Sequence, residues 1–583
     1  MIKSDIDNLS EYYRYELTYL RSAGEDFAIR FPKIARRLDL SHEESADPHV
    51  ERLIESFAFL TGKLQKQIDD LYPEMANAML DVIYKPLVLP TPSAVMVNLD
   101  VDLSKAQKNP GMVVPRQTTL TAIDTNGVAI SFRTSHDLKL WPIQLKNAEI
   151  VSNEESPLLK SETRTFIKLT FYNLAEGVVP PSLRFYITSD ALQRGKIFAG
   201  IFSSELPAVL HQNDSFEILS QITPVGLEDD EALFAYPDNV HKGFRYLQEY
   251  FSFPEKFYGF DVPLGKNLSK DFSIYLPLET NIKTISHAHF SMSAVPAVNL
   301  FPKVSEPLRL DFKQLEYLLV PDARRYSSHE IYDIEKIVAV DPDTNEEINI
   351  PEFYSCDHFS SKSDLNVFWL SKRKNSCKKD AMGDDIYVSF VDEGFNPSNS
   401  DNKVFYAYTL CTNRHLAEDV PARGILQTEL SLPVKQIYCI NRPTSQTNSL
   451  KNGELLWKII SALSLNSISF FDHGMKKFKE VLRLFADVTN SNLDDEINAI
   501  TGIECRHAIR RTVQQSWYGF INGTEICLNF DNQLHNCGLP LSLIVSKFLA
   551  TYTTINTFSE VSVKTQNGLV KKWAKQTGIK NYL

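Results

Sequence analysis

Residues 47–74, DPHVERLIESFAFLTGKLQKQIDDLYPE, carry the pattern that decides how the N-terminal part of this chain folds. Asp47 can cap a helix and Pro48 suits its first turn. One wide apolar stripe is formed by Val50, Leu53, Ile54, Phe57, Leu60, Leu64, Ile68 and Leu71. The spacing predicts a helix over 48–72. We expect Pro73 to end it and to start a shorter helix with Met75, Met79, Leu80 and Ile83.

A second amphipathic helix is predicted over residues 5–31. Its apolar side chains recur at steps of three, four and seven: Leu9, Tyr13, Leu17, Leu20, Phe27 and Phe31. The helices either form a bundle of their own or are completed by helices of a partner chain. The stripes are wider than a self-contained bundle needs, which favours a partner. The candidate interface is Leu9, Tyr13, Leu17, Leu20, Phe27, Val50, Leu53, Phe57, Leu60 and Leu64.

The apolar pattern of the sequence changes from helical to strand-like spacing at residue 93. Residues 95–101 alternate as a half-buried strand does, and strand-like runs recur at 165–172, 183–188, 271–277, 306–312, 334–340, 385–391 and 404–411. We interpret 371–384 and 393–403 as exposed polar loops. Helices are predicted again over 455–463, 473–486 and 541–552, with a strand near 558–564.

The predicted fold is therefore a multidomain α+β protein. We expect an N-terminal helical bundle region over 1–90 and β-sandwich-like domains over 91–290 and 291–445. A mixed α/β domain would follow over 446–583.

The composition is that of a globular cytosolic protein. The chain has 583 residues, a formal charge of −12 and seven Cys with no CxxC pair. The charge disfavours nucleic-acid binding, and the Cys spacing disfavours a disulfide scaffold. The N-terminus has no signal-peptide pattern, and no apolar run is long enough to insert into a membrane.

No catalytic template is complete. Phosphate-binding loops, the GxSxG elbow and the HExxH helix are all absent from the sequence. His287 and His289 provide too few ligands for a metal, and Cys505 with His507 is a weak candidate for a thiol nucleophile. The carboxylate runs at 229–231 and 384–385 are expected in solvated loops. We predict no catalytic residue, metal or cofactor; a carbohydrate-active enzyme would need two carboxylates facing a cleft.

Two further motifs have structural and docking interpretations. The segment EYFSFPEKF is either a packed corner of a β domain or a docking knob, through Tyr250, Phe251, Phe253, Pro254 and Phe257. Asn413 and Arg414 are expected to form a turn in which carbonyls or a carboxylate hold the guanidinium.

Ordered blocks of the chain resemble the TssF family, also called VasA or ImpG, of type VI secretion baseplates. The blocks include YYRYELTYLRSAGEDFAIRFPKIARRLDL at 12–40, DPHVERL at 47–53, FRYLQEYFSFPEKFYGFD at 244–261 and TLCTNRHL at 409–416.

The resemblance implies a structural wedge subunit on the cytoplasmic side of the inner membrane. The implied partners are TssG, TssK, TssE, a VgrG hub, sheath proteins and a membrane complex. Two TssF copies are expected for each TssG. A wedge protein of another phage-like contractile injection machine is the alternative.

Overall fold

The fold is described from a computed structural model, which divides the chain into two compact units. The first unit is Met1–Lys85 with Lys451–Leu463, and the second is Pro86–Leu450 with Ser464–Leu583. The structure describes residues 2–38, 48–124, 127–152, 165–175, 178–236, 242–279, 282, 284–310, 314–340, 346–353, 367–376, 383–392, 404–449, 453–463, 474–489, 493–514, 517–531, 535–551, 553, 557–566 and 568–577. The finer four-part division stays a prediction.

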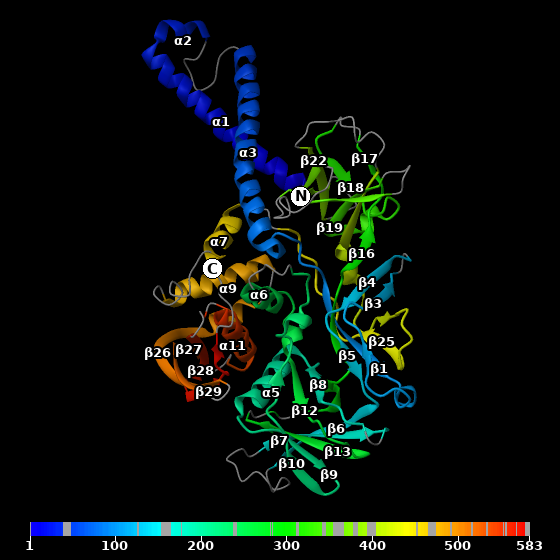
Figure 1. The fold of residues 1–583 in the computed structure, drawn as a ribbon. Helices are drawn as coiled ribbons and strands as arrows, with labels where there is room; N and C mark the ends of the chain where they lie inside the picture. The colour runs from blue at the N-terminus through cyan, green and yellow to red at the C-terminus, as the bar shows by residue number, and fades with distance from the viewer. Residues whose placement is uncertain are drawn as a thin grey trace. The chain divides into compact units, whose positions relative to one another are not determined.

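The first unit is helical. It contains α1 (Ile2–Arg30), α2 (Pro32–Leu38), α3 (Pro48–Tyr84) and α7 (Gly453–Leu463) (Figure 1). The prediction that Pro73 ends a helix is wrong, because α3 continues through it. Beyond Pro73, α3 buries Ala76, Leu80 and Tyr84. We attribute the continuation to this packing, which offsets the backbone hydrogen bond that proline cannot donate.

The second unit is built around several antiparallel sheets. The sheet of β1 has the order β24 (Ile425–Leu426), β25 (Val434–Cys439), β1 (Ala94–Val101), β15 (Ala294–Val298), β4 (Ala129–Thr134) and β3 (Thr119–Ile123). The sheet of β13 has the order β10 (Ser215–Ile218), β9 (Val209–Gln212), β13 (Asp271–Leu278), β7 (Thr165–Asn173) and β6 (Ile143–Ser152). The sheet of β12 has the order β11 (Thr223–Pro224), β12 (Gly259–Pro263), β8 (Ser182–Ile187) and β14 (Phe290–Ser291).

Two further sheets follow in the chain. The sheet of β23 has the order β16 (Phe301–Val304), β23 (Val404–Thr412), β19 (Glu330–Val340) and β20 (Glu347–Ile350), with β17 (Leu308–Arg309) also on β23. The sheet of β22 has the order β18 (Tyr317–Leu319), β22 (Asp384–Asp392) and β21 (Val367–Asn375). A small pair joins β2 (Met112–Val114) to β5 (Leu138–Leu140).

Strand β1 is buried on both faces, not half-buried as its alternation predicted. Val95, Val97 and Leu99 enter one hydrophobic core, whereas Ala94 and Met96 enter another. The strand pairs with β15 and β25, which lie far along the chain. It is therefore the element on which these two cores meet.

The C-terminal part of the second unit combines helices with a sheet. Its sheet, the sheet of β27, has the order β26 (Ile500–Gln514), β27 (Trp517–Phe530), β28 (Thr557–Thr565) and β29 (Gly568–Lys572), with β30 (Gln576–Thr577) also on β28. Helix α11 (His535–Ala550) packs on β28, and α6 (Lys242–Ser252) lies between α9 (Gly474–Val488) and α11 (Figure 1). The remaining α-helices are α4 (Leu103–Ala106), α5 (Ala191–Ser203) and α10 (Asp494–Asn498).

Most strand predictions are confirmed. Of the two loop predictions, one is corrected and the other cannot be compared with the structure. Within the run at 306–312, the described residues 306–310 contain only the short β17. Residues 371–375, predicted as an exposed loop, lie in β21, where they pair with β22 from Val388 to Asp384. The loop predicted over 393–403 lies outside the described residues.

Candidate protein interface and buried polar clusters

Helix α3 packs on α1 through its small residues. Ala58 is fully buried, and a Cβ added to Gly62 would lie 3.1 Å from backbone atoms of Tyr12 and Tyr13. The two helix backbones therefore come close to each other at Gly62, where α3 carries no side chain. The ion pair between Arg21 and Glu51 joins the same two helices.

The large apolar side chains of α3 point elsewhere. At about 100° per residue, Leu53, Phe57, Leu60 and Leu64 lie roughly 150° around the helix from Ala58 and Gly62. Their exposed fractions are 71%, 54%, 56% and 58%. These four side chains of the predicted apolar stripe are thus not covered by α1.

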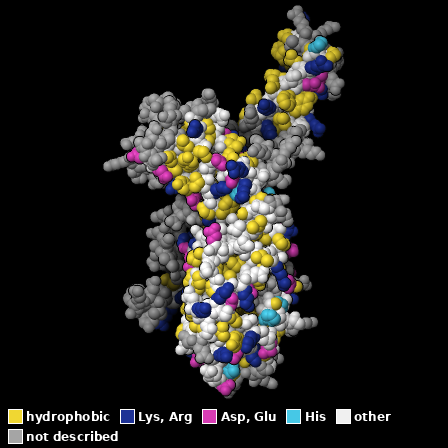
Figure 2. All heavy atoms as spheres, turned by 90° about the vertical axis from the view of Figure 1, so that its right-hand side faces the viewer, with side chains coloured by type: hydrophobic (Ala, Val, Ile, Leu, Met, Phe, Trp, Pro, Cys, Tyr) yellow, Lys and Arg dark blue, Asp and Glu magenta, His cyan; other side chains and the backbone are white. Residues whose placement is uncertain are grey.

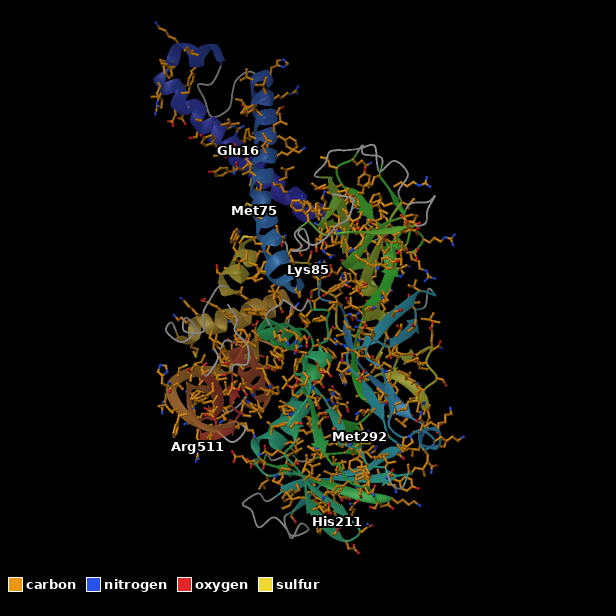
Figure 3. The ribbon with its side chains drawn as sticks, viewed as in Figure 1. Glu16, Met75, Lys85, His211, Met292 and Arg511 are labelled. Carbon is orange, nitrogen blue, oxygen red and sulfur yellow. The ribbon has the colours of Figure 1, made fainter. Side chains whose placement is uncertain are left out.

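The open surface continues along the helices of the first unit. Further exposed apolar residues are Tyr15, Tyr19 and Ile29 on α1, and Phe59, Ile68, Met75, Met79 and Ile83 on α3. Figure 2 shows hydrophobic side chains gathered on these helices between charged ones, and Figure 3 labels Met75 on α3. We call the set Leu53, Phe57, Leu60, Leu64, Ile68, Met75 and Met79 the α3 stripe.

The other candidate interface residues are half-buried. These are Leu9, Tyr13, Leu17, Leu20 and Phe27 on α1, and Val50 at the start of α3. Within the same unit, α7 packs on α3 and buries Leu456 and Ile459. The prediction that the ten residues form a partner interface remains a prediction, and an open α3 stripe supports it.

The aromatic segment lies in helical structure and is buried. Tyr250 and Phe251 belong to α6, and Phe253 precedes the 3₁₀ turn η4 (Pro254–Phe257). Each of the four aromatic side chains is at most 2% exposed, whereas Pro254 is half-buried. The ring centroid of Tyr250 lies 5.8 Å from that of Phe257. The cluster is packed inside the unit, on a helix and not at a β-domain corner.

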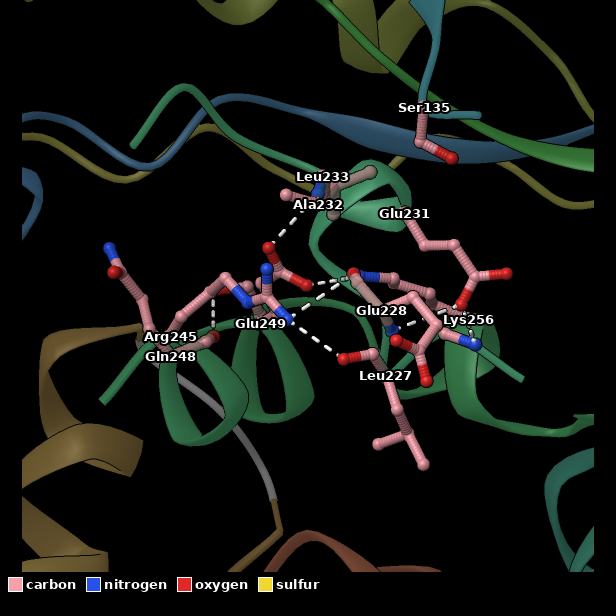
Figure 4. Close-up of polar contacts among 12 residues, drawn as sticks. Ser135, Leu227, Glu228, Glu231, Ala232, Leu233, Arg245, Gln248, Glu249 and Lys256 are labelled. Atoms are coloured by element: carbon pink, nitrogen blue, oxygen red, sulfur yellow. Dashed lines mark hydrogen bonds and ion pairs between the residues drawn. The ribbon is translucent and has the colours of Figure 1, made fainter. Parts of the chain in front are cut away.

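A buried ion pair holds α6 beside η4 (Figure 4). The Lys256 ammonium contacts the Glu249 carboxylate, and both side chains are at most 1% exposed. The second carboxylate oxygen of Glu249 accepts a hydrogen bond of 2.9 Å from the Leu233 amide. Burial lowers the pKa of Lys256, and Glu249 acts against that shift. Arg245 donates to the Leu227 carbonyl at 2.9 Å, which joins the segment that contains Leu227 and Leu233 to α6.

Arg414 occupies the turn that the sequence predicted. It has a φ of +52° and donates from Nε to the His329 carbonyl at 3.1 Å. Its Nη2 donates to Asp385 at 3.3 Å, and its Nη1 lies 4.0 Å from Glu330. The prediction of a solvated loop at Asp384 and Asp385 is wrong, because both are at most 5% exposed. Arg414 and Tyr326 provide the partners that let Asp385 be buried.

The second carboxylate run is also partly buried. Glu231 is 5% exposed, accepts from the Gly226 amide at 2.7 Å and pairs with Arg184 at 2.5 Å. Arg184 makes two further hydrogen bonds to Asp261, of 2.9 Å and 2.8 Å. Both carboxylates are thus held as partners of one guanidinium. The expectation of a solvated loop is wrong for Glu231.

These groups line a cavity of about 640 Å³ in the second unit, together with His136, Lys435 and Tyr438. Burial lowers the pKa of His136 to about 3, so its imidazole is neutral at physiological pH. Arg184, Glu231 and Asp261 in this wall are engaged in internal ion pairs.

The remaining chemical candidates have structural surroundings. His287 and His289 lie in a 3₁₀ turn, where Nδ1 of His289 accepts from the Ser286 amide at 3.3 Å. Within the described ranges, no three His, Cys, Asp or Glu side chains are grouped as metal ligands. Cys505 is exposed, but partial desolvation by neighbouring atoms still raises the pKa of its thiol to about 11, which is opposite to what a nucleophile needs. Among the described helices, none is both long and apolar enough to span a bilayer.

The fold and these sites define a class: a multi-sheet mixed α/β protein with internally paired buried charges and an open apolar helical surface. The family model described as "Type VI secretion system, TssF" matches residues 6–580. The chain therefore belongs to the TssF family of the type VI secretion system.

Individual relatives agree with this assignment. The chain is 26% identical to "Type VI secretion system component TssF1" of Pseudomonas aeruginosa over 98% of each chain. Its fold is similar to a chain of the type VI secretion TssK-TssF-TssG baseplate subcomplex, with a TM-score of 0.73 and 18% identity over 91% of this chain and 100% of that chain. It is also similar to a chain of the type VI secretion baseplate complex, with a TM-score of 0.54 and 19% identity over 98% and 100%.

Proposed function

We propose that this protein is a structural subunit of a type VI secretion baseplate wedge. Family membership and the baseplate assemblies that contain the similar chains support this role. In this proposal it binds TssG and TssK, and the wedge carries TssE and surrounds a VgrG hub to template the sheath and tube. The wedge would dock at the cytoplasmic face of the inner membrane. This scaffolding role requires no catalytic residue, metal or cofactor.

The observation that carries the proposal is the open α3 stripe. Completing the burial of Leu53, Phe57, Leu60 and Leu64 would contribute roughly 4–7 kcal/mol, taking about 1.5–3 kcal/mol for each fully buried side chain. A surface of this kind suits a permanent helical interface, which is typically large and apolar. We propose that TssG helices, with those of a second copy of this chain, cover it.

The test is co-purification with TssG. Leu53→Asp with Phe57→Asp places two charges in the interface, and we expect the complex to be lost because a buried unpaired carboxylate is costly. Leu315→Asp is the matched control, since Leu315 is 92% exposed and belongs to the second unit. Circular dichroism should show that both variants fold. Survival of the complex with the double variant would show that the α3 stripe is not the TssG site.

A further inference from the structure

Arg133 is a half-buried arginine of the second unit that has no partner group. It lies on β4, between Thr119 of β3 and Val298 of β15 in the register. Within the part of the chain that the structure describes, its side chain makes no hydrogen bond or ion pair. Its nitrogens are not among the fully buried polar atoms without a partner, so water reaches them. An incoming anion could therefore reach the guanidinium.

A second arginine stands beside it. Arg116 directly precedes Gln117, whose amide donates to the Thr134 carbonyl next to Arg133 at 2.9 Å. Nη2 of Arg116 donates to the carbonyl of Ala232, which is labelled in Figure 4, at 3.2 Å. Among the described residues, no carboxylate lies within ion-pair distance of Arg116 either. The two guanidinium groups thus repel each other without a counter-charge to offset the repulsion.

This lack of a carboxylate sets the two arginines apart. Every other described arginine of the second unit that is buried or half-buried has a carboxylate oxygen within 4.0 Å. These are Arg184, Arg194, Arg245, Arg373, Arg414 and Arg510. The fold therefore pairs its other shielded guanidinium groups internally and leaves these two for a group outside the chain.

The surroundings of Arg133 do not neutralise it. Burial lowers the pKa of Arg133 and Arg116 adds to that shift, whereas Tyr332 and Glu335 of β19 oppose it. Burial raises the pKa of Tyr332, so its phenol is neutral at physiological pH. Glu335 is exposed and makes no ion pair with Arg133. A partly desolvated guanidinium of this kind gains more from a carboxylate than a fully solvated one does.

The site suits a carboxylate that is presented by the surface of another protein. Neither arginine lines the cavity of about 640 Å³. The neighbouring residues Gln117, Thr119 and Glu335 are exposed, so the site is open and can meet a second surface. A second copy of this chain is disfavoured, because two chains of charge −12 repel each other.

We propose that Arg133, with Arg116 beside it, binds an aspartate or glutamate side chain of a baseplate partner protein. The planar guanidinium of Arg133 donates two parallel hydrogen bonds to the carboxylate, and Arg116 adds positive charge. This inference rests on the proposed function, because it takes the anion from a partner. The site belongs to the second unit and the α3 stripe to the first, so each can fail without the other.

The first test asks whether Arg133 serves the fold itself. Arg133→Met removes the charge and keeps an unbranched apolar stem. In the isolated full chain, hydrogen exchange of the β4 amides should be unchanged or slower, because the variant loses a partly desolvated charge that has no partner. Faster exchange in β4 would assign Arg133 a structural role and overturn the proposal.

The second test is a footprint with phenylglyoxal, which modifies arginine side chains, followed by mass spectrometry. The full chain is treated alone and in a complex with TssG and TssK. We expect modification of Arg133 to be about tenfold slower in the complex, because a guanidinium held by a carboxylate is shielded from the reagent. Arg309, an exposed arginine of β17, is the matched control and should react at the same rate in both.

Charge reversal measures the contribution to affinity. Arg133→Glu should raise the dissociation constant of the partner that protects Arg133 about tenfold. Arg309→Glu should leave that constant unchanged, and an equal effect of both reversals would show a general charge effect and overturn the assignment.

The remaining outcomes separate this inference from the proposed function. Equal reactivity of Arg133 in the isolated chain and in the complex would overturn the inference and leave the proposed function standing. A wild-type chain that assembles with neither TssG nor TssK would refute the proposed function, and this inference with it. Protection of the isolated chain by inorganic phosphate, as strong as in the complex, would assign the site to a phosphate ligand instead. Self-association that Arg133→Met abolishes would assign it to a second copy, and either result would overturn the proposal.

Discussion

Replacing Lys256 by Met should destabilise α6 far more than removing the entire ion pair. Met is close to Lys in volume, so the substitution leaves little empty space. It does leave the Glu249 carboxylate fully buried without its counter-charge, which costs about 3–5 kcal/mol. Adding Glu249→Gln removes that charge and keeps an oxygen to accept from the Leu233 amide. We expect the double variant to lie within about 1–2 kcal/mol of the wild type.

A third variant isolates the hydrogen bond. Glu249→Leu with Lys256→Met also removes the charge, but it leaves the Leu233 amide without its acceptor, and Leu233 is only 2% exposed. The additional cost over Gln should be about 1–3 kcal/mol. The order of stability should thus be wild type, Gln-Met, Leu-Met and finally the single Met variant.

The assay is native-state hydrogen exchange of the α6 backbone amides. It reports the free energy of local opening, so it does not require a 583-residue chain to unfold in one step. If Lys256→Met alone and the Gln-Met pair lost protection equally, the buried charge would not be the source of the cost. Unchanged protection in Lys256→Met would likewise refute the reasoning.

The other predictions concern pH, a turn and a helix contact. Burial raises the pKa of Glu496 to about 7, although the Tyr250 hydroxyl donates to its carboxylate at 2.6 Å. Because the folded state binds the Glu496 proton more tightly than the unfolded state does, stability should fall by roughly 3 kcal/mol between about pH 4.5 and pH 7 and then level off. Glu496→Gln should remove that slope in denaturant titrations. Arg414→Ala should cost about 3–5 kcal/mol by leaving Asp385 buried without its guanidinium, and Asp385→Asn in the same chain should recover part of the loss on thermal unfolding. Gly62→Leu should separate α1 from α3, because even a Cβ lies 3.1 Å from the facing backbone; increased proteolysis within residues 2–30 would report it, and unchanged cleavage would contradict it.

Local periodicity was sufficient to predict helices and strands whose apolar side chains recur at regular spacing. The spacing of Leu53, Phe57, Leu60 and Leu64 defines a stripe in any helix, and that stripe is present in α3. The alternating runs at 165–172 and 404–411 likewise became β7 and β23. The blocks that resemble the TssF family could also be recognised from the sequence, because each is a contiguous stretch of residues.

Some elements left a weaker local signal. The predictions contained no helix at α5 or α6, and the β26–β27 hairpin was missed. Its residues 505–511, CRHAIRR, interleave charged and small side chains without an apolar alternation. Pairing over the full length of β27, and of β27 with β28, stabilises this hairpin, whose buried apolar side chains lie mainly on β27.

Sequence alone determined where the strongly periodic helices and strands occur and which helix carries an apolar stripe, because those properties depend on neighbours a few residues away. Tertiary structure decided which faces are covered. Gly62 turned out to meet the α1 backbone, whereas Leu53, Phe57, Leu60 and Leu64 stayed exposed. Asp385 on β22 became a buried partner of Arg414, which lies just after β23, and β1 was buried on both faces by distant segments. Burial and charge pairing depend on contacts between residues far apart in the chain, and no local pattern contains that information.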